Sequence, residues 1–115
     1  MPPSRPRVQN LPRNLKHYFL AIFRPGAHWN QTEGAEELPA QQLAFLRAQF
    51  EAGNYRMAGP VTDGGEIAAM AIIEAESLEA AKIVAEQDPA VVTERLVVEV
   101  HPALLPALDA VRVEY

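Results

Sequence analysis

The stretch HYFLAIFRPG, residues 17–26, decides the fold of this 115-residue chain. It is rich in aromatic and branched residues, which favour a β-strand, and its final Pro-Gly predicts the turn that ends the strand. Successive side chains of a strand point to opposite faces of the sheet. Both faces of this strand are apolar, with Tyr18, Leu20 and Ile22 on one and Phe19, Ala21 and Phe23 on the other. We therefore expect the sheet to be covered on both sides.

Two main helices are expected after this strand. The segment PAQQLAFLRAQFEAG, residues 39–53, has apolar residues at helical spacing, a proline for its first turn and a glycine for a left-handed stop. Ser77 suits the N-cap of a second helix over residues 78–87. Asp88 and Pro89 then predict one further short helical turn, with Asp88 as its cap.

Three further strands complete the expected pattern. The segments YRMAGPV (55–61) and EIAAMAIIEA (66–75) flank an Asp-Gly-Gly that predicts a tight hairpin, and LVVEVH (96–101) predicts the last strand. On that strand Val97, Glu99 and His101 share one face, opposite Leu96, Val98 and Val100. We expect the first set to lie on the face away from the helices.

The order β-α-β-β-α-β predicts an α+β, ferredoxin-like subunit with a four-stranded antiparallel sheet. Two helices on one face leave the other face open, although the first strand is apolar on both sides. The rest of the chain is too short to cover that face. A second copy packed sheet to sheet is the economical solution, so we expect a homodimer.

Composition and charge indicate the limits of the folded domain and the classes of partner that we do not expect. Residues 1–16 form a basic, proline-rich arm that we expect to be extended or disordered, residues 17–103 one folded domain, and residues 104–115 a tail with a possible edge strand at Val111, Val113 and Tyr115. The net charge of the chain is −5. The arm has four basic residues and no acid, so the rest of the chain has a net charge of −9. We expect no nucleic-acid partner and no membrane span, and a soluble cytoplasmic protein.

Several ordered motifs resemble the YciI-like (YCII-related) family of small dimeric α+β barrel proteins. They are YFLAIFRPGAHWN (18–30), QLAFLRAQFEAGNYRMAGPV (42–61), ESLEAAKIVAEQDPAV (76–91) and VVEVHP (97–102). The resemblance implies a homodimer with facing sheets and a pocket that holds a His-Asp pair. Most members have no assigned reaction, and a few relatives act on chlorinated muconolactones. The family aspartate corresponds to Asp88, but the family's helix histidine corresponds to Gln42.

This replacement changes the expected chemistry. An imidazole exchanges a proton near neutral pH, whereas an amide only donates or accepts hydrogen bonds. Catalysis then requires another base in the pocket, and the candidates are His28, His101 and Asp88 itself. Each residue also has a purely structural interpretation. His28 is then a solvent-exposed loop residue, Asp88 a helix cap, and His101 the partner of Glu99 in a cross-strand or interface hydrogen bond.

Four more residues are candidate ligand contacts. Arg24 suits a carboxylate, Trp29 a lid over a flat molecule, and Gln42 and Glu99 polar contacts in the pocket. The chain has no cysteine and its three histidines are not closely spaced, so no metal or cofactor site is expected.

The leading hypothesis is an inter-sheet pocket that binds a small organic molecule, aromatic-derived or carboxylated, with acid-base chemistry of a lyase or hydrolase type. The first alternative is a binding or regulatory module without catalysis, in which Gln42 replaces the base. The second is a dimeric structural protein whose pocket is filled by side chains.

Overall fold

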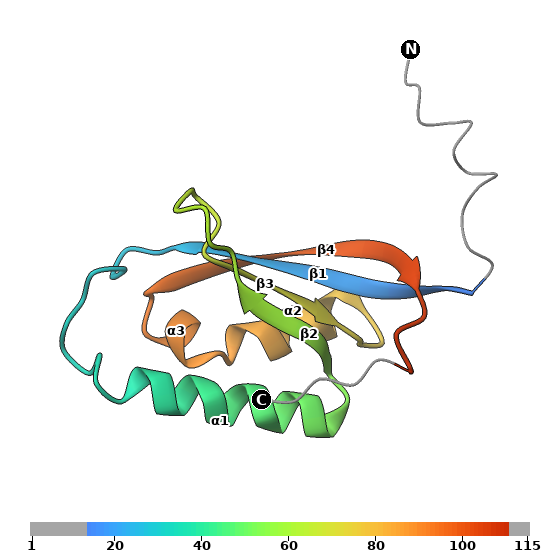
Figure 1. The fold of residues 1–115 in the computed structure, drawn as a ribbon, viewed down its shortest axis with the longest axis horizontal. Coiled ribbons are helices and arrows are strands. Elements are labelled where there is room, and N and C mark those ends of the chain that lie inside the picture. The colour runs from blue at the N-terminus through green and yellow to red at the C-terminus, as the bar shows by residue number, and fades with distance from the viewer. Residues whose placement is uncertain (1–13, 111–115) are drawn as a thin grey trace, which may run out of the picture.

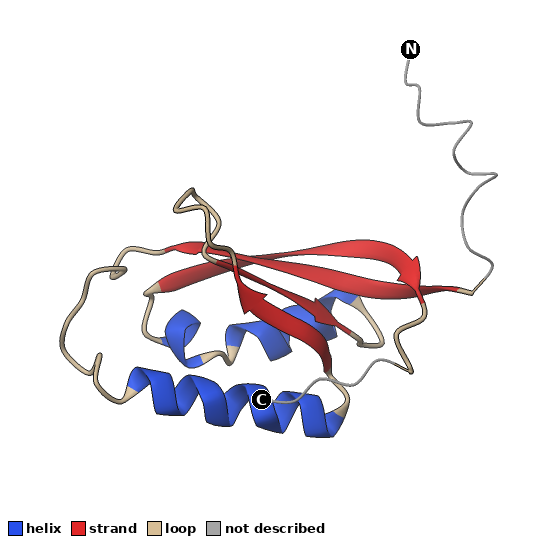
Figure 2. Ribbon diagram, in the orientation of Figure 1, coloured by secondary structure: helices blue, strands red, loops and turns tan. Residues whose placement is uncertain are grey.

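The computed structural model describes residues 14–110. Within that range the elements follow the order β1 (Leu15–Pro25), α1 (Leu38–Ala52), β2 (Tyr55–Pro60), β3 (Ala69–Ile73), α2 (Leu78–Glu86), α3 (Pro89–Val92) and β4 (Leu96–Pro106). The strands form one antiparallel sheet in the order β2-β3-β1-β4. The helices lie together on one face of this sheet (Figure 1 and Figure 2). The expected α+β, ferredoxin-like subunit is confirmed.

The local signals that begin and end the helices act as expected. The Ser77 hydroxyl accepts a hydrogen bond from the Ala80 backbone N–H at 3.1 Å and caps α2. Asp88 caps α3 through the Ala90 backbone N–H at 2.8 Å. Gly53 ends α1 at a φ of 80°, a backbone conformation that strongly favours glycine. These contacts join residues close in the chain, which is why sequence alone predicts them.

The hydrophobic core fills the space between the sheet and the helices. Small residues of α2, Ala81 and Ala85, are buried where that helix packs on β4 and β1, and Tyr55 of β2 meets two phenylalanines of α1 in edge-to-face contacts. The buried set contains Ala21, Phe23, Tyr55, Ala71, Ile73, Ala81, Ala85, Ala90, Leu96 and Val100. One face of the sheet therefore belongs to this core.

The two longest strands extend beyond the segments expected from the sequence. β1 begins at Leu15 and β4 runs to Pro106, and the two pair along their full length. Pro102 does not end β4 because β4 is an edge strand, and an edge strand tolerates a residue without an N–H. Residues 17 and 103, the expected domain limits, thus lie inside strands. The expected arm up to residue 13 and the possible strand at 111–115 lie outside the described residues.

The connection between β2 and β3 is longer than the tight hairpin that we expected. It covers residues 61–68, and β3 begins only at Ala69. The Asp63 carboxylate accepts a hydrogen bond from the Gly65 backbone N–H at 2.9 Å, and Gly64 has a φ of 72°. The aspartate side chain therefore closes a local turn within a wider loop, which replaces the two-residue turn.

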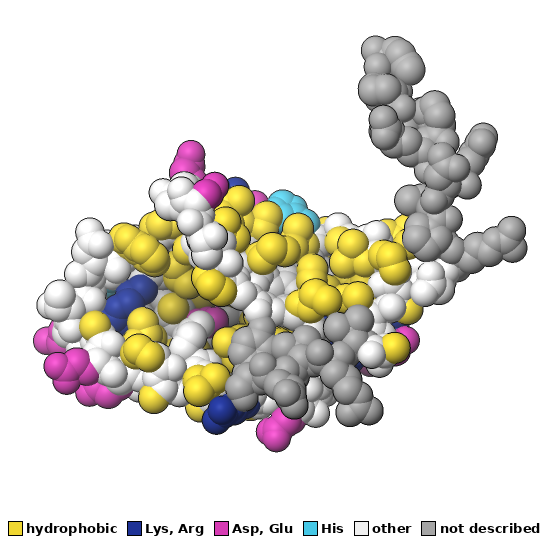
Figure 3. All heavy atoms as spheres, viewed as in Figure 1, with side chains coloured by type: hydrophobic (Ala, Val, Ile, Leu, Met, Phe, Trp, Pro, Cys, Tyr) yellow, Lys and Arg dark blue, Asp and Glu magenta, His cyan; other side chains and the backbone are white. Residues whose placement is uncertain are grey.

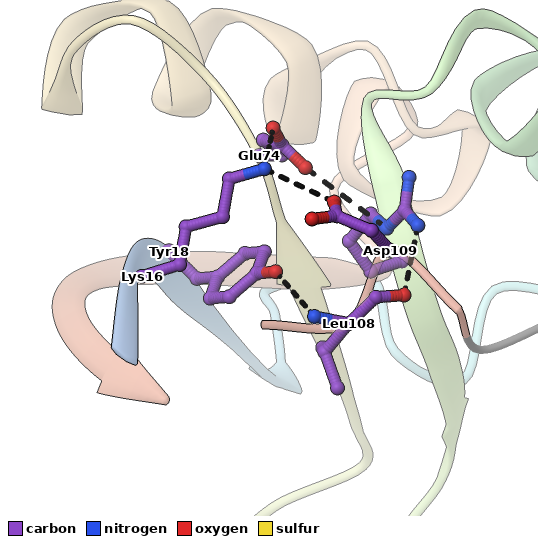
Figure 4. A network of polar contacts seen from close by, with 6 residues as sticks. Lys16, Tyr18, Glu74, Leu108 and Asp109 are labelled. Atoms are coloured by element: carbon purple, nitrogen blue, oxygen red, sulfur yellow. Dashed lines mark hydrogen bonds and ion pairs between the residues drawn. The ribbon is translucent and has the colours of Figure 1, made fainter. Parts of the chain in front are cut away.

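The chain after β4 folds back over one end of the outer face of the sheet, which is the face away from the helices (Figure 4). The Tyr18 hydroxyl accepts a hydrogen bond from the Leu108 backbone N–H at 2.7 Å, and Tyr18 is fully buried. Lys16 Nζ lies 2.8 Å from Glu74 and 3.1 Å from Asp109. The tail thus covers the outer face at Tyr18.

Among residues 14–110, no helix is both long and apolar enough to cross a lipid bilayer.

Candidate functional site

A pocket of about 200 Å³ opens between α1, the start of α3 and the β2-β3 side of the sheet. Figure 3 shows the front surface hollowed between α1 and the sheet. Most of the wall is apolar, and three of the residues that line it have polar side chains: Gln42, Tyr55 and Asp88. A mostly apolar pocket with a few convergent polar groups is the usual form of a small-molecule site.

Asp88 is buried, with 3% of its surface exposed, and both of its carboxylate oxygens are engaged. Oδ1 accepts from the Ala90 backbone N–H at 2.8 Å and Oδ2 accepts from Gln42 Nε2 at 2.7 Å. Burial raises the pKa of the Asp88 carboxyl, while the hydrogen bonds from Ala90 and Gln42 oppose that increase. Asp88 is therefore both a helix cap and a titratable group in the wall of the pocket.

Tyr55 is the functional residue that the sequence analysis missed. Its side chain lines the pocket and is 2% exposed, and its hydroxyl has no hydrogen-bond partner among the described residues. Burial, together with the charge of Asp88, raises the pKa of Tyr55, so the hydroxyl stays protonated. The sequence did contain a sign of this role. Tyr55 begins the strand that follows the end of α1 at Gly53, and a tyrosine hydroxyl buried there normally requires a hydrogen-bond partner.

Gln42 has an unpartnered atom as well. Its Nε2 donates to Asp88, and its buried Oε1 has no hydrogen-bond partner among residues 14–110. Gln42 and Asp88 are 46 positions apart in the chain, and the packing of α1 beside α3 brings them into contact. The pair that the sequence resemblance indicated is therefore assembled, with an amide in place of an imidazole.

The other candidate residues lie outside this pocket. Arg24, Glu99 and His101 form a charged cluster on the outer face, with Arg24 Nε 2.6 Å from Glu99 and His101 Nε2 2.7 Å from Glu99. The hydrogen bond from Arg24 is the main cause of a lowered Glu99 pKa, and His101 adds to it. Within the described residues, His101 makes no hydrogen bond with Asp88. We therefore expect this cluster to act separately from the pocket.

His28 and Trp29 are exposed on the loop between β1 and α1 and do not line the pocket. Hydrogen bonds to Glu94 and Arg95, the two residues that precede β4, hold the backbone of this loop in place. His28 N donates to the Glu94 carbonyl at 2.8 Å, and the buried Arg95 guanidinium donates to the carbonyls of Gln31 and Glu33. Arg95, which the sequence analysis also missed, thus determines the path of the loop.

No group of three or more His, Cys, Asp or Glu side chains in the described part of the chain is arranged to hold a metal ion.

We expect Asp88→Asn to be at least as stable as the native protein near neutral pH. The amide oxygen of asparagine keeps the cap on Ala90, and its nitrogen bonds to Gln42 once the Gln42 amide turns over. Asp88→Ala removes both contacts, and its free energy of unfolding should be about 2 kcal/mol below that of Asp88→Asn. Urea denaturation of both variants provides the measurement.

The raised pKa of Asp88 determines how the stability of the native protein changes with pH. Because the pKa of Asp88 in the folded protein is raised above 3.8, the associated stability is present below that value and is lost as the pH rises through the folded pKa. The advantage of Asp88→Asn over the native protein should grow as the pH rises above about 4 and become constant above the folded pKa. An asparagine variant as unstable as the alanine variant at neutral pH would contradict the account of Asp88 as a buried cap.

Comparison with known proteins adds one match. The family model of the YCII-related domain matches residues 16–102, which include β1 from its second residue, all the helices and most of β4. A search of curated proteins finds no match.

Proposed function

Since the chain belongs to the YCII-related family, we propose that it binds a small organic molecule in the pocket between α1 and the sheet and transfers a proton there through Asp88. One observation carries the proposal. A buried carboxyl that accepts a hydrogen bond from Gln42 of α1 belongs to the wall of a mostly apolar pocket. An apolar pocket with a few polar side chains in its wall is the usual form of a small-molecule site.

Asp88 is suited to proton transfer by its surroundings. Burial shifts its pKa upward, towards the range in which a carboxyl both accepts and returns a proton at neutral pH. Gln42 orients the carboxylate by donating to Oδ2 and leaves the proton chemistry to Asp88. Each carboxylate oxygen accepts one of these hydrogen bonds and keeps a second lone pair.

The proposed ligand is neutral. None of the described pocket residues is a lysine, an arginine or a histidine, and Asp88 is the acidic one. An anion here would meet like charge without a compensating cation, which is unfavourable in an apolar environment. Arg24, the residue that we expected to bind a carboxylate, is paired with Glu99 on the outer face. We therefore set aside the carboxylated ligand in favour of an uncharged one.

Isomerisation of α-angelica lactone, a neutral five-membered ring, tests the catalytic proposal. The reaction removes one proton from the ring and returns it at another carbon, and ultraviolet absorbance follows it. Catalysis by the native protein that falls about 100-fold or more in Asp88→Asn would support proton transfer by Asp88, because general acid-base catalysis has that magnitude. Since Asp88→Asn keeps the cap, the loss would not reflect unfolding.

The second candidate is a binding module without catalysis. It is favoured by the positions of His28 and His101, which place no imidazole beside Asp88 in the described chain. Gln42→His separates the two candidates. If the native protein is inactive on the lactone and the histidine variant gains turnover, or if both are inactive, the catalytic proposal fails and the binding module is preferred.

We also propose that a second copy of the chain covers the outer face of the sheet. The tail covers Tyr18, but apolar side chains of all four strands remain accessible beyond it. Met57, Met70 and Val97 are 39%, 40% and 50% exposed. Surfaces of this kind normally mark an interface, and a symmetric pair of sheets would bury them together.

A further inference from the structure

A β-bulge in β2 directs Arg56 towards the chain that follows β4. The register of β2 on β3 shifts between Tyr55 and Met57, so Arg56 is an extra residue without a partner in β3. Bulges of this kind redirect a side chain and are specific features of a sheet rather than defects. Here Arg56 donates from Nη2 to the Leu108 carbonyl oxygen at 2.9 Å. The bulge therefore provides a contact with the tail.

Both backbone groups of Leu108 are bound by side chains of the sheet. Its carbonyl accepts from Arg56, and its N–H donates to the Tyr18 hydroxyl at 2.7 Å, a bond that Figure 4 shows. The preceding residue is also held, because the Ala107 N–H donates to the Asn14 carbonyl at 2.9 Å. Since β1 and β2 both bind one residue of the tail, the segment is fixed across the end of the sheet.

Lys16 adds a charged contact to this site. Its Nζ lies 3.1 Å from Asp109 Oδ1 and 2.8 Å from Glu74 Oε2, and it lies 5.9 Å from the centre of the Tyr18 ring. The Asp109 side chain is 65% exposed, and exposed ion pairs contribute little to stability. The bonds to the backbone of the tail are therefore its main attachment.

We call residues 107–109 the latch, and Lys16, Tyr18 and Arg56 the latch site. The latch is a short segment near the end of the described residues. Segments of this kind open locally while the rest of a domain stays folded. Opening of the latch thus leaves the sheet intact.

The latch covers apolar surface that would otherwise extend the outer face. Tyr18, Leu20 and Ile22 lie on the same face of β1 by strand alternation. Leu20 and Ile22 are partly exposed, whereas Tyr18 is fully buried beneath Lys16 and the latch. A tyrosine ring has a large apolar area. Opening of the latch would therefore enlarge the surface available to a second copy.

We propose that the latch limits the association of copies of this chain through the outer face. While the latch is docked, the Tyr18 ring is covered, and a partner contacts only the apolar side chains beyond it. When the latch opens, Tyr18 joins that surface and association becomes tighter, because burial of apolar area drives association. This inference rests on the proposed pairing of two copies and adds a regulation of its strength.

The experiment opens the latch by changes in the latch alone, in the full chain. Leu108→Pro removes the N–H that bonds to the Tyr18 hydroxyl, and Asp109→Ala removes the carboxylate beside Lys16. Sedimentation velocity over a range of concentrations gives the dissociation constant for self-association. We expect the double variant to associate at least about tenfold more tightly than the native chain, which requires only part of the Tyr18 ring to become buried.

Leu108→Met combined with Asp109→Glu is the matched control. It keeps the backbone N–H and C=O of residue 108 and a carboxylate at residue 109, so it should associate like the native chain. Arg56→Ala removes the donor to the Leu108 carbonyl from the side of β2 and should tighten association, as the double variant does. The NMR signals of the Tyr18 ring report whether the latch is docked in each variant.

The outcomes separate this inference from the proposed pairing. A native dimer whose dissociation constant is unchanged in the double variant overturns the latch and leaves the pairing standing. A native monomer that pairs only after the latch opens supports the latch and contradicts pairing of the native chain. Monomers at every concentration contradict both. Unchanged Tyr18 signals in the double variant also overturn the inference, because the bonds named here would then not hold the latch.

Discussion

Gly26→Ala is expected to lower the free energy of unfolding by about 2–3 kcal/mol, the upper range for a forced steric insertion. A Cβ at position 26 would lie 2.5 Å from the Glu94 carbonyl oxygen and 3.2 Å from the Leu96 carbonyl carbon. These are backbone atoms, so no side-chain rotation relieves the contact. The hydrogen bonds from Gly26 N to the Arg95 carbonyl and from His28 N to the Glu94 carbonyl, both 2.8 Å, hold the two segments at this separation.

Gly59→Ala is the control for this measurement. A Cβ at Gly59 has no atom within 4 Å, and its φ lies outside the left-handed region. The variant should match the native protein or be slightly more stable, because alanine restricts the unfolded chain. Urea denaturation of both variants gives the comparison. If Gly26→Ala were as stable as Gly59→Ala, the close approach of the β1 exit to the start of β4 would not be a constraint on this fold.

Leu20→Glu is expected to convert the proposed dimer into a monomer, with dimer affinity reduced at least about 100-fold. Leu20 lies on β1, an inner strand of the sheet, and strand alternation places it on the outer face between Ile72 of β3 and His101 of β4. A carboxylate there would be desolvated between two apolar surfaces, and this costs several kcal/mol. Sedimentation velocity at micromolar concentration measures the change.

Ile83→Glu is the control for the interface. Ile83 is 58% exposed on α2, on the helix side of the subunit, so the same charge there should leave the dimer intact. Met57→Glu, at a 39% exposed position on the outer face, provides a second test that disturbs the folded subunit less than Leu20→Glu. A native protein that sediments as a monomer, or equal dimers for all three variants, would rule out pairing through this face.

Strand alternation and capping explain how much of the fold could be predicted from the sequence. The two apolar faces of β1, the cap at Ser77 and the left-handed stop at Gly53 depend on residues that are neighbours in the chain. The lengths of β1 and β4 were underestimated because Pro102 reads as a stop. It is tolerated because β4 lies at an edge of the sheet, and a strand's place in the sheet is not a local property.

For the candidate site too, the sequence indicated some of the residues, and only the structure showed which of them are in contact. The resemblance of the sequence to the family indicated Gln42 and Asp88, and the structure places them 2.7 Å apart. The sequence offered His28 and His101 as partners for Asp88 on equal terms. The structure places His101 against Glu99 on the opposite face of the sheet and His28 on an exposed loop. Spacing along the chain carried no information on either distance.

By itself the sequence determined the element order, the faces of the residues of β1 and β4, and the caps at Ser77 and Asp88, because these follow from backbone geometry over a few residues. Only the tertiary structure decided that Tyr55 and Asp88 line one pocket, that Gln42 donates to Asp88, and that Arg24 is already paired with Glu99. Those features depend on which distant segments pack together. A side chain acquires its hydrogen-bond partner, or lacks one, only after that packing is complete.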